Sequence, residues 1–346
     1  MLHSLKSRVM GKLRSSPLFN SLTTPIRASG KAAPFLIAWN RMVLLDLAPF
    51  LLALACHSAS AAPDAWKPLV DKTQARFESI AAAQGGVMGL VVEDLAGEFR
   101  FAVNADRQFP QASAIKIPIL MELLKQDHEG KLKLADRAWI EKANRIPGGV
   151  LGELGDHTVE MSLEDLAVLM ILVSDNTATN ILIERVGMAN VTATMQSLGC
   201  PRTMLRRVML DTAASQRGEE NVSTPAEAAR LMRLLAEGKF INRATSDHAL
   251  TILRKPKPGA VNAALPKEIS VAFKPGGIPG VATEWALVEL SGRPYIVTAM
   301  IHFGLKEGDQ CAGCQQSIRE VSQVAYEFFS RTAGTTPYGV YVEPTK

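Results

Sequence analysis

The sequence of 346 residues contains only four cysteines, too few for a fold that depends on disulfide bonds. Cys200, Cys311 and Cys314 lie beyond the first 61 residues, and their odd number argues against a disulfide framework. Cys311 and Cys314 stand three apart, a spacing that fits a local disulfide or two free thiols. No second pair of cysteines or histidines at metal-ligand spacing accompanies them, so we predict no metal site. No other pattern indicates a cofactor.

The chain also lacks an excess of charge of either sign once its N-terminus is set apart. Residues 1–61 hold seven lysines and arginines and a single acidic residue, Asp46. The remainder carries 31 basic and 33 acidic side chains, out of totals of 38 and 34. This balance excludes a basic face of the kind that binds nucleic acid. With 47% hydrophobic and 21% charged residues, the composition is that of a globular protein rather than a disordered one.

No apolar run is long and uninterrupted enough to be a membrane span, and we expect none in the mature chain. The best candidate, Met42–Cys56, is short and contains an aspartate and a proline. A basic residue, Arg41, precedes this run and small residues follow it, which is the pattern of a secretory signal. We therefore expect residues 1–61 to be an N-terminal extension with a signal peptide. Cleavage near Ala62 would release a secreted or periplasmic protein.

Two alternatives at this end stay open. The forty residues before Met42 are unusually many for a leader, so translation starting at Met42 is one hypothesis. Attachment of lipid to Cys56 is the other, although the residues before it fit the usual attachment pattern poorly.

Hydrophobic periodicity predicts helices and strands whose order defines a fold class. Two strands near the start of the mature chain and three near its end, with helices between them, predict an α/β (α+β) fold. We expect a mixed, mainly antiparallel five-stranded sheet flanked by the terminal helices, plus an all-helical lobe. One domain, 62–346, would contain a sheet lobe of about 66–105 and 260–332 and a helical lobe of about 106–259. The strands are expected over residues 87–94, 99–103, 269–274, 283–290 and 295–303; the main helices over residues 66–83, 163–173, 177–186, 225–237, 244–254 and 315–330, and directly after Ser113.

The stretch most suggestive of chemistry begins at Ser113, with Lys116 three residues later and a strongly apolar run behind it. Residues three apart on a helix are neighbours, so we expect these two side chains to touch. The first turn of a helix also presents unpaired N–H groups and positive potential, which suit an activated hydroxyl and a developing oxyanion. A plain helix cap with a solvated lysine is the structural alternative.

Two further clusters follow along the chain. Ser174-Asp175-Asn176 lies between two predicted helices, where a hydroxyl can relay a proton and an amide can orient a substrate. Its structural alternative is again a helix cap. Lys274-Pro-Gly-Gly277 ends a predicted strand, where glycines let the backbone approach a ligand closely. A lysine at a strand edge also serves merely to prevent aggregation.

In this order, Ser-x-x-Lys, Ser-Asp-Asn and Lys-x-Gly resemble the motifs of class A β-lactamases and the related penicillin-binding proteins. Three neighbouring segments agree with the resemblance, namely Ser162–Leu166, Val173–Leu182 and Asn221–Pro225. The likeness covers roughly residues 66–332, nearly the whole mature chain. It implies a β-lactamase/transpeptidase-like fold and a serine hydrolase that forms an acyl-enzyme.

The resemblance implies catalytic roles for three residues that match the motifs. Ser113 would be the acylated nucleophile, and Lys116 would accept its proton directly or through water. Ser174 would pass a proton to the leaving nitrogen.

The resemblance also implies how a substrate is held. Asn176 would anchor the substrate's side-chain amide, and Lys274 would pair with its carboxylate. The late Lys-x-Gly motif brings Gly276 and Gly277 to the substrate, and the oxyanion hole would use the backbone N–H groups of Ser113 and Gly277.

The first departure from the family pattern concerns the late motif. Pro275 replaces a hydroxyl residue between Lys274 and Gly276, which removes a side-chain donor and a backbone N–H. Further on, Glu284 stands where many β-lactamases place an arginine. We expect a carboxylate there to weaken the binding of an acidic substrate by repulsion.

The second departure concerns the glutamate that releases the acyl group in true β-lactamases. Counting back from Pro225 puts its position near Val208, which cannot act as a base. Asp211 is the nearest carboxylate in this loop and our tentative candidate for the base. Its structural alternative is a partner that braces Arg206 or Arg207.

These observations predict an exported monomeric serine hydrolase acting on a β-lactam or on a peptidoglycan-like amide or ester. One alternative is a penicillin-binding-protein-like peptidase, transpeptidase or esterase with slow release of the acyl group. An alternative of another class is a non-catalytic binding protein that uses the same cleft.

Overall fold

The computed structural model describes residues 64–304 and 311–342. The predicted signal peptide, the alternative start at Met42 and the lipid acceptor Cys56 therefore lie outside the described residues. Within those residues, no helix is long and apolar enough to cross a membrane.

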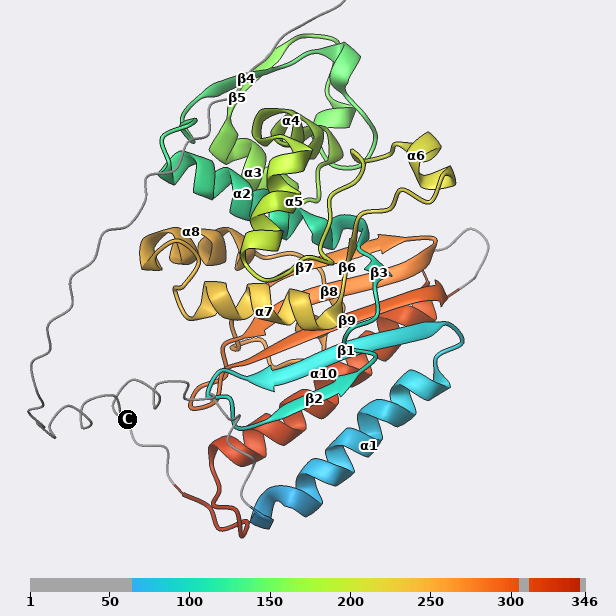
Figure 1. The fold of residues 1–346 in the computed structure, drawn as a ribbon, viewed down its shortest axis with the longest axis vertical. Coiled ribbons are helices and arrows are strands. Elements are labelled where there is room, and N and C mark those ends of the chain that lie inside the picture. The colour runs from blue at the N-terminus through green and yellow to red at the C-terminus, as the bar shows by residue number, and fades with distance from the viewer. Residues whose placement is uncertain (1–63, 305–310, 343–346) are drawn as a thin grey trace, which may run out of the picture. The chain divides into compact units, whose positions relative to one another are not determined.

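A five-stranded sheet lies at the centre of one lobe, with its strands in the order β2-β1-β9-β8-β7 (Figure 1). Every neighbouring pair is antiparallel, so the expected fold class is confirmed and the sheet contains no parallel pair. The strands are β1 (Val87–Asp94), β2 (Arg100–Val103), β7 (Val271–Ile278), β8 (Gly280–Val288) and β9 (Tyr295–Gly304).

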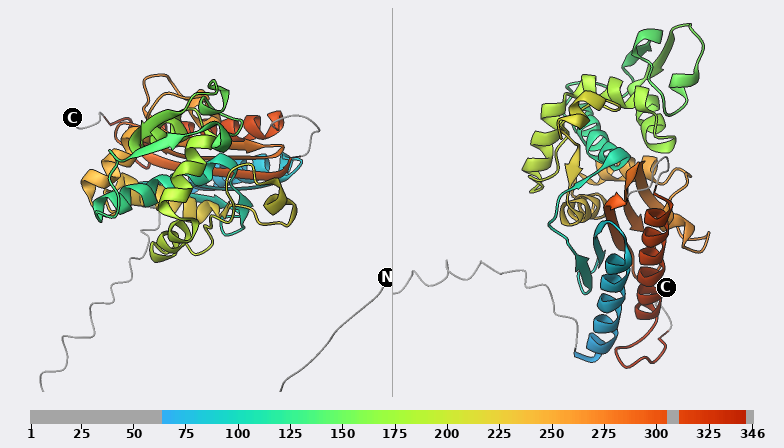
Figure 2. Two further views of the ribbon diagram at one scale, coloured as in Figure 1. Left: turned by 90° about the horizontal axis from the view of Figure 1, so that it is seen from above. Right: turned by 90° about the vertical axis from the view of Figure 1, so that its right-hand side faces the viewer.

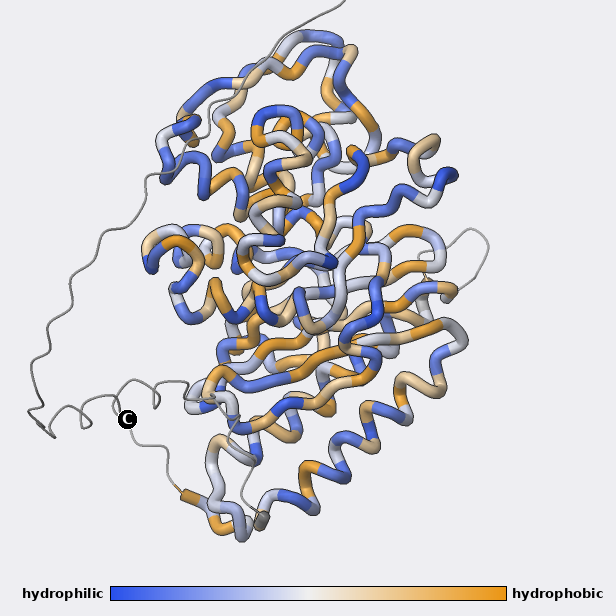
Figure 3. Tube along the Cα trace, in the orientation of Figure 1, coloured by the Kyte–Doolittle hydropathy of each residue, from blue (hydrophilic) through white to orange (hydrophobic). Residues whose placement is uncertain are grey.

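Both faces of this sheet are covered, which explains why its later strands are almost continuously apolar. Along β9, alternate residues enter two different cores: Val297 and Ala299 pack on one face, whereas Ile296 and Met300 pack on the other. All nine residues of β8 are buried. Figure 3 shows this as mostly hydrophobic colouring along the strands, in contrast to the mixed colouring of α1.

The first and last long helices, α1 (Lys67–Ala83) and α10 (Ala312–Ala333), lie side by side on one face of the sheet (Figure 2). Arg76 of α1 and Glu327 of α10 form an ion pair of 2.6 Å. Between the helices and the sheet, Phe328 packs edge-on against Phe99 and Phe101. On the other face, α7 (Pro225–Ala236) begins at the capping hydroxyl of Thr224.

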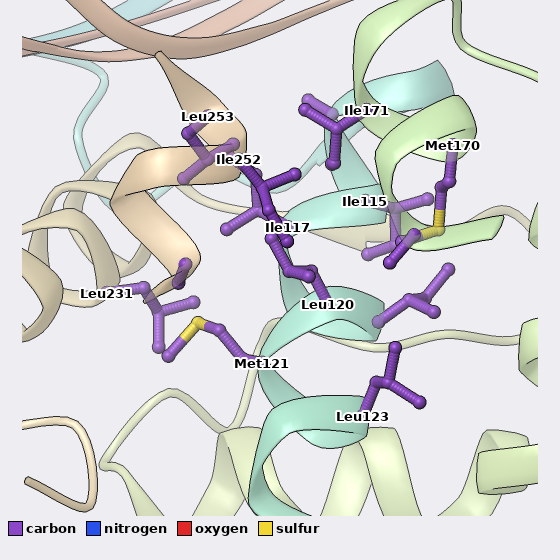
Figure 4. Packing of buried hydrophobic residues seen from close by; sticks show 14 of the residues in the cluster. Ile115, Ile117, Leu120, Met121, Leu123, Met170, Ile171, Leu231, Ile252 and Leu253 are labelled. Atoms are coloured by element: carbon purple, nitrogen blue, oxygen red, sulfur yellow. The ribbon is translucent and has the colours of Figure 1, made fainter. Parts of the chain in front are cut away.

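The helical lobe is built around α2 (Lys116–His128), in which ten of the thirteen residues are buried. Leu120, Met121 and Leu123 of this helix meet side chains of the helices around it (Figure 4). Such a helix, apolar on nearly all sides, has to lie inside a bundle. Around it pack α3 (Leu163–Leu172), α4 (Asn176–Val186), α5 (Met188–Ser197) and α8 (Arg243–Leu253).

The remaining elements are short. They include α6 (Thr212–Gln216) and α9 (Ala260–Ala263). The others are the two-stranded ladders β3 (Phe109–Pro110) with β6 (Val222–Ser223) and β4 (Arg137–Ile140) with β5 (Val159–Ser162), and the 3₁₀ turns η1 (Asp64–Trp66), η2 (Ala112–Ile115), η3 (Lys142–Asn144) and η4 (Leu151–Glu153).

One strand extends further than predicted. The strand expected over residues 269–274 continues as β7 through Pro275 to Ile278, and the reversal occurs between Ile278 and Gly280. Pro275 pairs in register with Glu284 of β8. The strand tolerates a proline because β7 is the edge of the sheet, where a missing N–H need not break a ladder bond.

The three cysteines that the structure describes form one pair and one single residue. Cys311 and Cys314 form a disulfide at the start of α10, the first of the two alternatives that the sequence left open. Cys200 is buried as a free thiol, and burial raises its pKa to about 12. A thiol in such surroundings is unreactive, because the thiolate is the nucleophilic form.

Candidate active site

Ser113 lies in η2, the tight turn that leads directly into α2. The turn is held against the sheet by its neighbour Gln111, whose main-chain oxygen accepts from Thr283 Oγ1 at 2.9 Å. The side-chain oxygen of Gln111 accepts from Trp285 Nε1, also at 2.9 Å. These two residues of β8 fix the position of the turn and hence of the Ser113 hydroxyl.

Gly276 of β7 permits this close approach of strand and turn. A Cβ atom added there would lie 2.6 Å from the main-chain oxygen of Gln111 and 2.7 Å from the nitrogen of Ala114. Both of these are backbone atoms that cannot move aside, so a side chain at position 276 would push the strand away from Ser113. The glycine is thus required by packing at the site.

Ser174 is the hub of the hydrogen bonds around Ser113. Its hydroxyl donates to Ser113 Oγ at 2.8 Å and accepts from Lys116 Nζ at 3.0 Å and from Lys274 Nζ at 3.2 Å. Lys116 Nζ donates further to the main-chain oxygen of Ser174 at 2.8 Å and to Asn176 Oδ1 at 2.9 Å. Among the described residues, no hydrogen bond joins Lys116 directly to Ser113. The link between them runs through Ser174.

In the short connection between α3 and α4, two neighbouring residues make different contacts: Asp175 caps α4, and Ser174 contacts Ser113. Asp175 is the cap: its carboxylate accepts from Ala178 N of α4 at 2.8 Å and from Val150 N and Leu151 N of the preceding loop at 2.7 Å each. Ser174 has φ of +56°, a left-handed conformation that is rare outside glycine. The strained backbone aims the Ser174 hydroxyl at Ser113 while Asp175 holds the helix.

Burial changes the acid–base properties of both lysines. Enclosure in the protein lowers the pKa of Lys116 from 10.5 to about 7, and the Asp175 carboxylate opposes this shift only in part. Burial also lowers the pKa of Lys274 well below 10.5, helped by the positive charges of Lys116 and Lys257. An amine with a pKa near neutrality is able to accept a proton at physiological pH.

A cavity of about 540 Å³ opens beside this cluster. Its lining brings together Ser113, Ser174, Lys274, Gly276 and Gly277, five of the residues singled out in the sequence. Lys116 and Asn176 are not in the lining, and Lys116 donates to both Ser174 and Asn176. The Lys116 side chain is completely buried.

Other parts of the lining were not foreseen from the sequence. One wall is the segment 258–263, and the start of α10 contributes Gln315 and Arg319. Arg319 is exposed and forms no salt bridge among the described residues, so it offers a positive charge to the cavity. The sequence placed α10 correctly as a covering helix, but its periodicity does not reveal that its first turns reach the site.

The structure places Asp211 away from this cavity. Its carboxylate caps α6 by accepting from Ala214 N at 2.9 Å, and Asp211 is absent from the lining. The alternative, in which the Asp211 carboxylate braces Arg206 or Arg207, is not observed among the described residues either. Arg207 pairs with Glu220 instead. Among the residues that the structure describes, no aspartate or glutamate lines the cavity.

Glu284 also differs from expectation. Its side chain is fully buried and does not line the cavity, so the predicted direct repulsion of an acidic substrate is not built into the site. The carboxylate instead accepts from Ala260 N at 2.8 Å and Val261 N at 3.2 Å, the first two residues of α9.

Within residues 64–304 and 311–342, no group of histidine, cysteine or acidic residues is arranged to hold a metal ion.

An antiparallel sheet packs on a helical lobe, and hydrogen bonds join two serines and two buried lysines between them. This combination defines the class of β-lactamases and penicillin-binding proteins. Comparison with known proteins agrees. The chain belongs to the beta-lactamase enzyme family, whose family model matches residues 72–329. The resemblance identified from the motifs is thereby confirmed.

Individual relatives are distant but cover most of the chain. An imipenem-hydrolyzing β-lactamase of Enterobacter cloacae is 27% identical over 250 residues, which are 70% of this chain and 84% of the relative. Among solved structures, a β-lactamase from Sphaerobacter thermophilus is 30% identical with a TM-score of 0.66, covering 77% of this chain and 98% of that chain. A variant of PBP-A, solved as an acyl-enzyme complex with penicillin G, is 27% identical with a TM-score of 0.68, covering 75% and 97% respectively.

Proposed function

We propose that this protein is an exported serine hydrolase that forms an acyl-enzyme on Ser113 with β-lactams or related amides and esters. The observation that carries the proposal is the chain of hydrogen bonds from Lys116 through Ser174 to Ser113. A nucleophile joined to a base of near-neutral pKa is the arrangement that acyl transfer requires. The family membership and the acyl-enzyme of the related PBP-A variant support it.

Acylation would proceed by transfer of the Ser113 proton along this chain. With Lys116 neutral, Ser174 gives its proton to Lys116 Nζ and takes the proton of Ser113, whose oxygen attacks the carbonyl carbon. The carbon–nitrogen or carbon–oxygen bond of the substrate then breaks. The proton held at Lys116 returns through Ser174 to the leaving atom, so the charges balance.

The groups that would hold the substrate are arranged around this path. Asn176 and Lys274 would anchor its amide and its carboxylate, and the N–H groups of Ser113 and Gly277 would bind the oxyanion. The position of Pro275 supports the last assignment. In an edge strand, a proline turns its nitrogen outward, and the residue two further along, Gly277, then points its N–H the same way.

Release of the acyl group is proposed to be slow. No carboxylate of residues 64–304 and 311–342 lines the cavity, and the family's glutamate position falls near Val208. Loss of a general base typically costs about 10²–10⁴-fold in rate. This observation favours the second candidate function, a penicillin-binding-protein-like peptidase, transpeptidase or esterase, over a rapid β-lactamase.

One experiment separates the candidates. The purified protein is incubated with a fluorescent penicillin and, separately, with nitrocefin, and the acylated species is identified by mass spectrometry. Stable labelling with little nitrocefin turnover is the expected result, and rapid turnover would instead establish a β-lactamase. Ser113→Ala should abolish labelling, with Ser197→Ala as a matched control that labels normally. Absence of labelling by penicillin and by a general serine-hydrolase probe would leave the non-catalytic binding protein.

Export and a monomeric state belong to the same proposal. The basic, apolar and small-residue pattern of residues 41–61 supports export, as does the disulfide between Cys311 and Cys314, since disulfides persist in oxidising compartments. N-terminal sequencing of the exported protein should begin near Ala62, and light scattering on a size-exclusion column should give the mass of one chain.

A further inference from the structure

The disulfide between Cys311 and Cys314 is a chemical group for which the reaction outlined above has no use. It lies at the first turn of α10, a helix of 22 residues, and Cys311 is the residue that caps this helix. The main-chain nitrogen of Cys314 donates to the sulfur of Cys311 at 3.3 Å. The two cysteines are only three residues apart, so the bond closes this one turn and joins no distant segments.

The part of α10 that follows the disulfide reaches the active-site cavity. Gln315 comes directly after Cys314, and Gln315 and Arg319 both line the cavity. Residues three or four apart on a helix share a face, so Gln315, Arg319 and Ser322 form one row along α10. Ser322 Oγ donates to the main-chain oxygen of Val261 at 2.9 Å, which ties the row to α9 in the wall of the cavity. The row therefore leads from the disulfide to that wall.

Between the disulfide and the contact with α9, little else holds this row in place. Within residues 64–304 and 311–342, no side-chain hydrogen bond joins Gln315 or Arg319 to another helix or strand, and Arg319 donates only to Gln316 of the same helix at 3.4 Å. The sulfurs pack against Gly304 at the end of β9, where an added Cβ atom would collide with both. Two thiols need more room than a disulfide, and this tight contact leaves none. Cleaving the bond should therefore shift the first turn of α10.

The pair also has the features of a disulfide that can be reduced without unfolding. Cys311 keeps 8% of its surface exposed, whereas Cys314 is fully buried, so an attacking thiolate reaches Cys311 first. Reduction leaves a cysteine at the N-terminus of a long helix, where unpaired N–H groups and the helix dipole stabilise a thiolate. Stabilising the reduced form makes a disulfide easier to reduce, and the entropy of a ring this short opposes reduction little.

The exchange needs a dithiol as reductant, for example a protein with a thioredoxin-type Cys-x-x-Cys motif. The first thiolate of the reductant bonds to Cys311 Sγ, and Cys314 Sγ leaves with the electron pair of the broken bond and takes a proton. The second thiol of the reductant then displaces Cys311 in the same way. The reductant ends as a disulfide, and its two electrons and two protons are then on Cys311 and Cys314.

We propose that the disulfide between Cys311 and Cys314 is a redox switch on the active-site cavity. Oxidised, it fixes the start of α10 so that Gln315 and Arg319 keep their places in the lining. Reduced by a dithiol, it releases the first turns of the helix and weakens the capture of an anionic substrate, because Arg319 no longer has a fixed position. The inference rests on the proposed acylation of Ser113.

The first test needs no acylation. The native protein is treated with dithiothreitol, desalted and alkylated with a maleimide, and its mass is measured. We expect two adducts per chain after reduction and none before it, with the buried Cys200 unmodified. Hydrogen exchange should be faster in the reduced than in the oxidised protein for peptides covering 311–322 and 258–263, and the same for 323–333. A pair that reacts only after unfolding, or equal exchange in both states, would overturn the switch.

The second test compares the rate constants of acylation in the two redox states after the reductant has been removed. Reduction should lower the constant for a fluorescent penicillin, which carries a carboxylate, by about three- to tenfold, the loss expected for one charge-assisted contact. The reaction with an uncharged fluorophosphonate should not change. An unchanged constant for the penicillin, or an equal loss with the fluorophosphonate, would show that the disulfide does not control substrate capture.

Variants assign the response to this pair and to Arg319. Cys200→Ala should respond as the wild type does. The double variant Cys311→Ser and Cys314→Ser keeps a hydroxyl cap, and it should have the low rate constant of the reduced protein with or without reductant. In Arg319→Gln, reduction should cause no further loss, because the two changes remove the same contact. A redox response as large in Arg319→Gln as in the wild type would contradict this route.

The wild-type protein is compared with itself in two redox states, so the outcome does not require any variant to fold. If the wild-type protein is not labelled by penicillin, the proposed function fails. The number of maleimide adducts and the hydrogen exchange still decide whether the disulfide controls the start of α10.

Discussion

Lys116 shows how burial changes the acid–base properties of a single side chain. Its amine has no exposure to solvent, and its three hydrogen-bond acceptors are the two oxygens of Ser174 and one oxygen of Asn176. None of these acceptors is a carboxylate. The lowering of the pKa by burial is therefore only weakly offset, and the pKa of Lys116 falls to about 7. The same residue on a solvated helix face would remain protonated and be useless as a base.

The rate of acylation should therefore rise with pH through about 7, because Lys116 is protonated below its pKa and accepts a proton only above it. Stopped-flow measurement with a fluorescent penicillin from pH 5.5 to 8.5 would locate this acid limb. Lys116→Arg, which stays charged, should lower the rate by about 10²-fold or more at every pH. A limb near pH 7 that survives in Lys116→Arg would contradict the assignment.

Arg319 is a second residue whose role emerges only from the structure. Its position in the lining of the cavity predicts that it attracts the carboxylate of a substrate. Arg319→Gln should lower the acylation rate constant for a penicillin by about three- to tenfold, through weaker binding, and leave a penicillin methyl ester unaffected. Arg331→Gln, on the last turn of the same helix, is the control. An equal loss with the ester would argue against a charge effect.

At the scale of elements, the start of α10 matters because it carries both a disulfide and part of the cavity lining. Cys311 and Cys314 pack against the end of β9, where a Cβ atom on Gly304 would come within 2.6 Å of both sulfurs. The disulfide closes the first turn of the helix, and the next turns carry Gln315 and Arg319. The covalent bond thus steadies the helix end that reaches the site.

Reduction of this disulfide should lower stability modestly, because it closes a very short loop. Loop-entropy arguments give about 2 kcal/mol, or a fall in Tm of about 3 °C for a protein of this size. Differential scanning fluorimetry with and without dithiothreitol would measure it. The double variant Cys311→Ala and Cys314→Ala should melt at the lower temperature and no longer respond to reductant. A response that persists in this variant would point to another cause.

The sequence predicted the helices and strands better than it predicted the contacts between them. The helices expected from residues 163 and 225 begin there in the structure, behind the caps Ser162 and Thr224, because helix starts depend mainly on nearby residues. The sequence also singled out Ser113, Lys116, Ser174 and Lys274, which the structure brings together, since each belongs to a short pattern. The 258–263 wall, the reach of Arg319 and the burial of Glu284 were missed, because they depend on packing between segments far apart in the chain.

At the scale of the whole molecule, the site lies where two cores meet. η2 and the Ser174 connection belong to the core of the helical lobe, whereas Lys274 and the glycines belong to the edge of the sheet. Three lysines, Lys116, Lys257 and Lys274, are buried around this junction. Folding must therefore remove three ammonium groups from water, which costs stability as long as they are charged.

This arrangement predicts an unusual dependence of stability on pH. The pKa of Lys116 falls to about 7 and that of Lys257 to about 8, so between these values and 10.5 the folded chain binds fewer protons than the unfolded chain. Stability then rises with pH over this window. Scanning calorimetry should show Tm increasing by several degrees from pH 7 to 9.5, and less so in Lys116→Met. A Tm that falls steadily across this range would contradict the prediction.

Pro275 has one more consequence, for the way the molecule meets other chains. An open edge strand beside a cavity invites extended segments to pair with it, whether from a long peptide or from another copy of the protein. Pro275 removes one of the outward donors that such pairing needs, next to the Gly277 N–H that the proposed chemistry uses. The strand can thus offer the Gly277 N–H to a compact substrate while being a poorer template for aggregation.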